Sequence, residues 1–449
     1  MTSRWIVVGA GSAGCAVAAR LSEDPDRLVT LLEAGPALDA PGTLPTGPPS
    51  DSTAIDGANF FDALGARGRT YVDLLASRSA GDVPRPYLRG RGLGGSSAVN
   101  AMVALPGDPA IYASWGWDDV DAAWRRVAVP CETADETELG PVDRALLASS
   151  NADLVPLTRR DGRRVSSAEA YLWPVVDRAN LAIRVECVVD SVVIDRRRAV
   201  AVQLVDGSAL DADHVVLAAG AIHSPAILLR SDVDTQGVGE GLQDHPSVPF
   251  TLVMHRPVTD PSVSLVTATI LQQDGFQLLP MNHLGGGADT AGLGVLMAAV
   301  MRPHGRSGIV KLRSPDPLDH PDVHFNLLHD RRDVDQMMEA AGLARSVLAQ
   351  PAFRDAVDAI QIDDHGTSVD ALDDADAMRS WVSAVGGDYV HASSTCAMGR
   401  VVDGDGAVIG YERLSVCDAS VFPSIPDVNT HLPTTMLAER LVARWMSDG

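Results

Sequence analysis

The first 34 residues alternate short apolar runs with a glycine-containing turn. Apolar residues cluster at 5–8 and again at 28–32, and between them small and apolar residues fill positions 13–21 after two glycines. A short apolar run, a glycine turn and a helical pattern predict a strand, a tight turn, a helix and a second strand. This order is typical of an α/β protein with a parallel sheet.

Four later segments carry weaker patterns. Residues 36–83 are rich in Gly, Pro, Ala and Asp, which predicts an excursion over the surface. Residues 90–103 join glycines and serines to an apolar, helix-like stretch, and residues 118–127 suggest a further helix. Residues 131–164 predict mainly loops.

The second half of the chain alternates strands with turns. Residues 182–194 and 199–210 predict paired strands, and residues 214–231 predict a buried strand, a glycine turn and a helix. From 247 to 384 the pattern changes to alternating segments such as SVPFTLVMH and GIVKLRS, followed by an amphipathic helix at 333–348. We therefore expect a separate sheet with a helical cover in this region.

Composition excludes several classes of protein. The 449 residues are 46% hydrophobic and 21% charged, which is typical of a globular protein and not of a disordered or fibrous one. The formal net charge of −23 opposes binding to nucleic acid or to an anionic membrane surface unless a local basic patch exists. The one candidate, Arg196–Arg198, is short and is interpreted as a solvated turn, so no nucleic-acid partner is expected.

Cysteine usage and the apolar runs bear on metal sites and location. The five cysteines are odd in number and lack a CxxC spacing, so we expect neither a disulfide framework nor a metal site. The first apolar run begins almost at the initiator methionine, and no run approaches the ~18 residues of a membrane helix. These features predict a cytoplasmic protein without a membrane span.

A dinucleotide-binding pattern follows the first predicted strand. Gly9, Gly11 and Gly14 form G-x-G-x-x-G at the start of a helix, which brings backbone N–H groups to a pyrophosphate. Glu33 ends the second strand, where a carboxylate accepts hydrogen bonds from ribose hydroxyls and disfavours a 2′-phosphate. The pattern leaves NAD and FAD open, and a glycine turn that only packs a helix on a strand is the alternative.

Six longer motifs are spread over nearly the whole chain. They are RGRGLGGSSAVNAM, GAIHSPAILLRS, VGEGLQDHP, RSGIVKLRSPDPLDHPDVHFNLL, VHASSTCAMG and LSVCDASVFPSIPDVNTHLPTTMLAERLV. Together and in this order they resemble the glucose-methanol-choline (GMC) oxidoreductases, which are FAD-dependent enzymes that oxidise alcohols. The first two resemble the two family signatures, and the third resembles the segment that follows the second signature. The fourth resembles the sequence of the family's substrate domain, and the last two resemble its C-terminal catalytic block.

The resemblance implies a fold and a cofactor. The fold is α/β, with a Rossmann-like FAD-binding domain formed by residues 1–246 and 395–449 and an inserted α+β substrate domain, built on an antiparallel sheet, at residues 247–394. Val99 stands where members with covalently linked flavin carry a histidine, so FAD is expected to be non-covalent. The chain is shorter than is usual for the family, which suggests a more open substrate cavity or one completed by a partner.

The resemblance also assigns site residues. His391 becomes the base that takes the hydroxyl proton of the alcohol, and Asn429 becomes the group that orients the substrate oxygen. His431 is a weaker candidate for the cavity wall or a flavin contact, whereas His223 and His245 are interpreted as structural. Cofactor contacts are expected from Gly9, Gly11, Ser12, Ala13, Gly14, Glu33, Ala34, Arg91, Gly94, Gly95, Ser96, Asn100, Val189, Ala219, Gly220, Asp418, Ala419 and Thr430.

The sequence leaves four functions to compare. The first is oxidation of a small-molecule alcohol, with electrons passed to oxygen or to another acceptor. The second is a lyase of the hydroxynitrile-lyase type that uses His391 as acid and base without net redox. A flavin-binding protein without turnover is disfavoured by the intact pair of His391 and Asn429, and a nicotinamide dehydrogenase is disfavoured by the flavin signatures.

Overall fold

The computed structural model describes residues 2–36, 57, 59–261 and 263–447. A five-stranded parallel sheet holds the N-terminal and C-terminal segments together, in the order β21-β12-β1-β2-β8. Its strands are β1 (Ser3–Val8), β2 (Arg27–Leu32), β8 (Leu181–Arg184), β12 (His214–Leu217) and β21 (Leu414–Val416). The predicted strand, turn, helix and strand at the N-terminus therefore form as expected.

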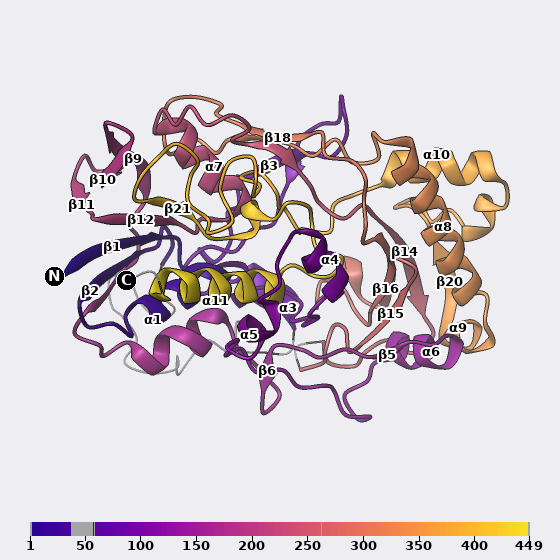
Figure 1. The fold of residues 1–449 in the computed structure, drawn as a ribbon. Coiled ribbons are helices and arrows are strands. Elements are labelled where there is room, and N and C mark those ends of the chain that lie inside the picture. The colour runs from indigo at the N-terminus through magenta and orange to yellow at the C-terminus, as the bar shows by residue number, and fades with distance from the viewer. Residues whose placement is uncertain (1, 37–56, 58, 262, 448–449) are drawn as a thin grey trace.

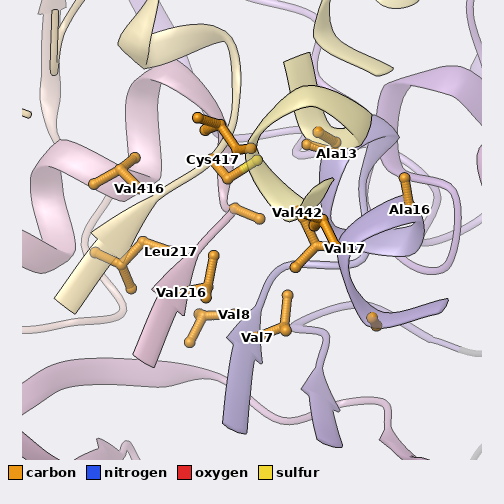
Figure 2. Close-up of a cluster of buried hydrophobic side chains, with 14 of the residues drawn as sticks. Val7, Val8, Ala13, Ala16, Val17, Val216, Leu217, Val416, Cys417 and Val442 are labelled. Atoms are coloured by element: carbon orange, nitrogen blue, oxygen red, sulfur yellow. The ribbon is translucent and has the colours of Figure 1, made fainter. Parts of the chain in front are cut away.

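Helices cover this parallel sheet. α1 (Ser12–Leu21) and α11 (His431–Ser447) lie side by side against it, although they come from opposite ends of the chain (Figure 1). Figure 2 shows how β1, β12 and β21 contribute apolar side chains to the core beneath these two helices. Because α1 is built largely of alanine and other small residues, its backbone can approach the sheet closely.

Other elements surround the parallel sheet. α7 (Gly220–Arg230) follows β12 directly, as the glycine turn in the sequence predicts. An antiparallel three-stranded sheet is formed by β9 (Val189–Asp195), β10 (Arg198–Leu204) and β11 (Ala209–Asp211). Both features agree with the strand and turn pattern of residues 182–231.

A six-stranded antiparallel sheet forms the other half of the molecule (Figure 1). Its order is β20-β14-β17-β16-β15-β5, with β5 (Asp153–Leu154), β14 (Ser247–Met254), β15 (Thr269–Gln273), β16 (Phe276–Met281), β17 (Leu293–Val300) and β20 (Val357–Gln361). One face packs a second apolar core against α6 (Pro141–Ser149), α8 (Arg331–Leu348), α9 (Pro351–Ala356) and α10 (Ala375–Val385). The predicted amphipathic helix is α8, with Asp330 as its N-cap.

A third sheet corrects one expectation. The segment GIVKLRS was expected in the inserted sheet, but its strand β18 pairs with β13 and β19 instead. The full order is β13-β18-β19-β3-β4, with β3 (Leu75–Ser77), β4 (Arg85–Pro86), β13 (Glu240–Leu242), β18 (Gly308–Lys311) and β19 (Asp322–His324). A period-two pattern shows which face of a strand is buried but does not name its partner.

Two further expectations need correction. Residues 131–164 are mainly loops, as expected, but they also contain α6, which begins at Pro141 and is tied to the antiparallel sheet through Asp143 and Asn282. The helix expected within 90–103 is only a short 3₁₀ turn, Gly95–Ala98. α3 (Phe60–Gly65), α4 (Pro109–Ser114) and α5 (Val120–Trp124) are short helices, the last within the predicted 118–127.

In the part of the chain that the structure describes, no helix is long and apolar enough to cross a membrane.

Candidate active site

The turn between β1 and α1 is shaped by close approach of the backbone. A Cβ atom on Gly14 would lie 1.8 Å from the carbonyl oxygen of Gly9, so only glycine fits there. A Cβ on Gly11 would meet no atom within 4 Å, because Gly11 borders open space. No side chain caps the N-terminus of α1, so its free N–H groups face that space and favour an anion.

Glu33 makes backbone contacts that the sequence did not reveal. Its buried carboxylate accepts hydrogen bonds from the N–H of Ala10 at 2.8 Å, of Gly35 at 2.9 Å and of Gly92 at 2.9 Å. A carboxylate offers about four acceptor positions, which leaves room for one further donor such as a ribose hydroxyl. Glu33 therefore holds the glycine turn and the Gly92 segment together as well as bordering the cavity.

A cavity of about 660 Å³ lies between the parallel sheet and the six-stranded sheet. Of the residues predicted to contact cofactor or substrate, all but two line it. Gly14 packs against Gly9, and Gly94 donates its N–H to the carbonyl of Ala10 at 2.8 Å. The structure thus brings to one cavity His391, Asn429, His431, Gly9, Gly11, Ser12, Ala13, Glu33, Ala34, Arg91, Gly95, Ser96, Asn100, Val189, Ala219, Gly220, Asp418, Ala419 and Thr430.

His391 meets a second histidine. Its Nδ1 lies 2.9 Å from Nδ1 of His245, and Nε2 of His245 lies 2.9 Å from the carbonyl oxygen of Pro426. On the other side of the ring, Nε2 of His391 lies 3.5 Å from Nδ2 of Asn429. Sequence reasoning assigned His245 only a structural role, although it stands inside the quoted VGEGLQDHP motif, because a motif does not show which histidines meet.

Asp244 fixes the backbone that carries His391. Its buried carboxylate accepts from the hydroxyl of Tyr87 at 2.7 Å and from the N–H groups of His245 at 2.7 Å, Tyr389 at 3.1 Å and His391 at 2.9 Å. Burial, together with the nearby Asp388 carboxylate, raises the pKa of Asp244 above its usual range. These contacts hold the segment from 389 to 391 in place.

Asp244, His245 and His391 also form a group with metal-ligand chemistry. One ligand atom from each lies within 4.8 Å of the others. The Nδ1 atoms of His245 and His391 are hydrogen-bonded to each other, and the Asp244 carboxylate already accepts from four donors. A ligand must present a free lone pair to the metal, so this arrangement fits a hydrogen-bonded network better than a metal site.

Desolvation keeps the histidines of the site neutral. Burial lowers the pKa of His391 well below its usual range, and the neighbouring His245 and Arg89 act in the same direction. Burial also lowers the pKa of His245 to about 3 and that of His431 to about 4. At neutral pH each of the three rings is therefore an uncharged imidazole.

Two polar atoms at the cavity have no hydrogen-bond partner among the described residues. These are Oδ1 of Asn429 and Nε2 of His431, whose Nδ1 is bonded to Oγ of Ser12 at 2.9 Å. Buried polar atoms are almost always paired, so unpaired ones that border a cavity point to a bound group. The N-terminus of α11, where His431 begins the helix, lies at the same cavity and favours negative charge there.

The wall opposite the parallel sheet is apolar. Leu279 and Met281, two residues apart in β16, lie on the same face of the strand, and Met297 of β17 pairs with Leu279. Met102 and Val103, both buried, extend the same surface. This part of the cavity can bury hydrocarbon and offers few groups to bind a charge.

Two charged side chains border the cavity near His391, and both have partners. Asp388 accepts from Nε of Arg78 at 2.5 Å, and Arg78 also donates to three backbone carbonyls. Arg89 donates to the carbonyl of Val390 and packs over the ring of Tyr87 at 4.9 Å. These charges support the loop that carries His391.

Comparison with known proteins decides the family. Two models described as GMC oxidoreductase match residues 128–247 and 303–438, which together make up more than half of the chain. The chain belongs to the GMC oxidoreductases. As a GMC oxidoreductase it is an FAD-dependent enzyme that acts on CH–OH groups. The open face at Gly11, the uncapped α1 and the unpaired polar atoms of Asn429 and His431 fit such a cofactor.

Alignments with relatives cover nearly the whole length of this GMC oxidoreductase. An uncharacterized GMC-type oxidoreductase from Rhodococcus erythropolis is 30% identical, covering 99% of this chain and 98% of the relative, and mitochondrial choline dehydrogenase from Mus musculus is 30% identical over 97% and 88%. The first alignment spans 528 positions against 449 residues, so that relative carries insertions that this chain lacks. Pyridoxine 4-oxidase from Mesorbium loti has a similar fold, with a TM-score of 0.88, 23% identity and 99% of both chains covered.

Proposed function

We propose that this GMC oxidoreductase oxidises an uncharged, largely apolar alcohol to an aldehyde or ketone. His391 accepts the hydroxyl proton on Nε2, and Asn429 orients the substrate oxygen. FAD supplies the hydride acceptor, at N5 of its flavin ring. The observation that carries the proposal is the pair formed by Nε2 of His391 and Nδ2 of Asn429, 3.5 Å apart at the cavity.

The chemistry needs a base and a donor at the same oxygen. A hydride leaves an alcohol carbon readily only when negative charge develops on its oxygen, so proton removal must accompany the transfer. A neutral imidazole can take that proton, and the depressed pKa of His391 keeps it neutral at physiological pH. The Nδ2 group of Asn429 donates to the developing alkoxide, which is the kind of fixed donor that stabilises transition-state charge.

The residues that would hold FAD divide into three groups. Gly11, Ser12 and the N-terminus of α1 would hold the diphosphate, and Glu33 would accept from a ribose hydroxyl; their position at the cavity supports these roles. The turn after Gly94 and the N-terminus of α11 border the rest of the cavity. Val99 lines the cavity with an aliphatic side chain that cannot form a covalent bond to a flavin, which supports non-covalent binding.

The cavity wall supports an apolar substrate. Leu279, Met281 and Met297 offer hydrocarbon, and each buried CH₂ of a substrate gains about 0.8 kcal/mol. Asp388 and Arg89 are engaged by protein partners, so neither is free to pair with a charged substrate. A quaternary ammonium or a carboxylate therefore fits this wall less well than an aliphatic or aromatic alcohol.

The test is the visible spectrum of the purified holoenzyme during anaerobic titration with alcohols. Straight-chain alcohols of increasing length, benzyl alcohol, choline and glucose form the panel. The proposal predicts bleaching by the apolar alcohols, with kcat/KM rising about four-fold for each added CH₂ until the wall is filled. A flavin that no alcohol bleaches would contradict the proposal and favour the lyase. Rapid recovery of colour in air would identify an oxidase, and slow recovery would identify a dehydrogenase.

A further inference from the structure

Three groups form an unbroken hydrogen-bonded line behind the base. The carbonyl oxygen of Pro426 lies 2.9 Å from Nε2 of His245, and Nδ1 of His245 lies 2.9 Å from Nδ1 of His391. Nε2 of His391, at the far side of the ring, faces Asn429. The line thus runs from a backbone carbonyl through two imidazoles to the cavity.

The positions of the protons follow from the first group. A carbonyl oxygen can only accept, so Nε2 of His245 must carry a proton. His245 is fully buried and neutral, so its Nδ1 has a lone pair and acts as the acceptor. Nδ1 of His391 must then be the donor, which leaves the lone pair of His391 on Nε2.

We propose that His245 is a positioning residue that fixes His391 in the tautomer with a free lone pair on Nε2, facing the substrate. This inference rests on the proposed function, in which Nε2 takes the hydroxyl proton. His245 touches neither substrate nor cofactor in this account and acts only through His391. An amide N–H of Asn429 that faces Nε2 is compatible with a lone pair there.

The surroundings hold both rings rigidly. The N–H of His245 donates to Asp244 at 2.7 Å, and the segment with Pro426 is tied to the same strand region, since the N–H of Ile425 donates to Gln243 at 3.1 Å. The rings of His245 and Tyr389 each lie nearly perpendicular to the His391 ring, at centroid distances of 5.1 Å. His391 therefore cannot rotate without breaking several contacts.

A neutral orienting group has a physical advantage over a carboxylate at this place. A buried carboxylate behind the base would require burial of a second charge beside Asp244. An imidazole whose other nitrogen is satisfied by a carbonyl sets the same tautomer without adding charge. The base is then oriented while remaining neutral before it reacts.

The first test compares three variants of the holoenzyme. His245→Leu removes the acceptor, and His245→Asn keeps an amide oxygen near the position of Nδ1. We expect the anaerobic rate of flavin reduction by a good alcohol to fall about 100-fold in His245→Leu, the lower end of a base's usual contribution, and to recover to within about 10-fold of wild type in His245→Asn. His214→Leu, which removes a partly buried histidine that is hydrogen-bonded to Ser415, is the matched control and should keep the wild-type rate.

The second test does not depend on turnover and reads the tautomer in the wild-type protein. ¹⁵N NMR of histidine-labelled wild-type protein, with the His391 signals assigned from the His391→Asn spectrum, reports which ring nitrogen carries the proton. The proposal predicts a protonated Nδ1 and an unprotonated Nε2 for His391.

The results separate the inference from the function on which it rests. Three results would each overturn the inference. The first is a protonated Nε2 on His391 in the wild type, and the second is a His245→Leu variant that retains flavin and the full reduction rate. The third is equal slowing in the Leu and Asn variants with an unchanged tautomer of His391. If no alcohol reduces the wild-type flavin, the proposed function fails, while the NMR spectrum still decides the tautomer.

Discussion

Replacement of Glu33 by alanine should lower the free energy of unfolding even without FAD. The carboxylate satisfies three backbone N–H groups, those of Ala10, Gly35 and Gly92. Leaving a buried donor without a partner costs about 1–3 kcal/mol, so the three together represent about 3–9 kcal/mol before water or backbone movement offsets part of it. Since a folded protein is stable by only about 5–15 kcal/mol, the loss should be large.

The assay is urea unfolding of the apoprotein, combined with the FAD content of the holoenzyme measured from its absorbance. Glu33→Gln is the graded variant: one amide oxygen can still accept from Gly35 and Gly92, whereas the contact to Ala10 is lost. We expect the order wild type, Gln, Ala in both the free energy of unfolding and FAD retention. Glu23→Ala, which removes a partly exposed ion pair with Arg20, is the control and should change stability by less than about 1 kcal/mol.

The opposite result would be clear. If Glu33→Ala apoprotein unfolds at the wild-type urea concentration and only FAD affinity falls, the carboxylate serves the ribose alone. If FAD content is also unchanged, Glu33 has no part in binding the cofactor.

Three further perturbations concern the apolar wall, the Arg78–Asp388 ion pair and the histidines with lowered pKa values. Met297→Glu places a carboxylate in the apolar wall and should lower kcat/KM for apolar alcohols at least about 10-fold in steady-state assays with flavin content unchanged; an unchanged value would remove that wall from the substrate site. Arg78→Met leaves the Asp388 carboxylate without its cation and should cost about 3–5 kcal/mol in urea unfolding, so a loss below about 1 kcal/mol would refute the pairing. Burial lowers the folded pKa of His214 and of His431 to about 4, so the unfolded chain binds more protons between pH 6.5 and 4; stability should be fully present above pH 6.5 and fall as the pH drops toward 4, and a flat profile in urea titrations would contradict this.

The elements that sequence patterning predicted are those fixed by local rules. The β1–α1–β2 unit and α8 follow from apolar periodicity, glycine placement and an Asp N-cap. α6 was missed because its nine residues lie among loops, and its position depends on Asp143 and Asn282, which are distant in sequence. The partner of β18 was missed because a strand pattern does not encode which edge it joins.

The candidate site shows the same division. The motifs predicted which residues gather at the cavity, because the glycine turns and the pair of His391 and Asn429 stand at fixed positions in the family's sequence motifs. They did not predict that Glu33 would bond three backbone N–H groups, or that His245 would contact His391. Apart from the local contact of Glu33 with Gly35, these contacts join segments more than twenty residues apart, and single-residue propensities do not contain how such segments pack.

The division of the chain into an FAD-binding and a substrate-binding domain stays a prediction. The boundary expected at residue 247 is the first residue of β14. However, α6 and β5 from before that boundary pack with the six-stranded sheet, and β18 and β19 from after it pair outside that sheet. Expression of residues 247–394 alone would therefore leave an incomplete sheet.

The role of His391 as the base is tested by the anaerobic rate of flavin reduction by the best alcohol, measured by stopped-flow absorbance for wild type and for His391→Ala with equal flavin content. If His391 is the base, the variant should retain FAD and reduce about 10²–10⁴ times more slowly. A variant that reduces its flavin at the wild-type rate would show that another group removes the proton, and the proposed mechanism would be wrong.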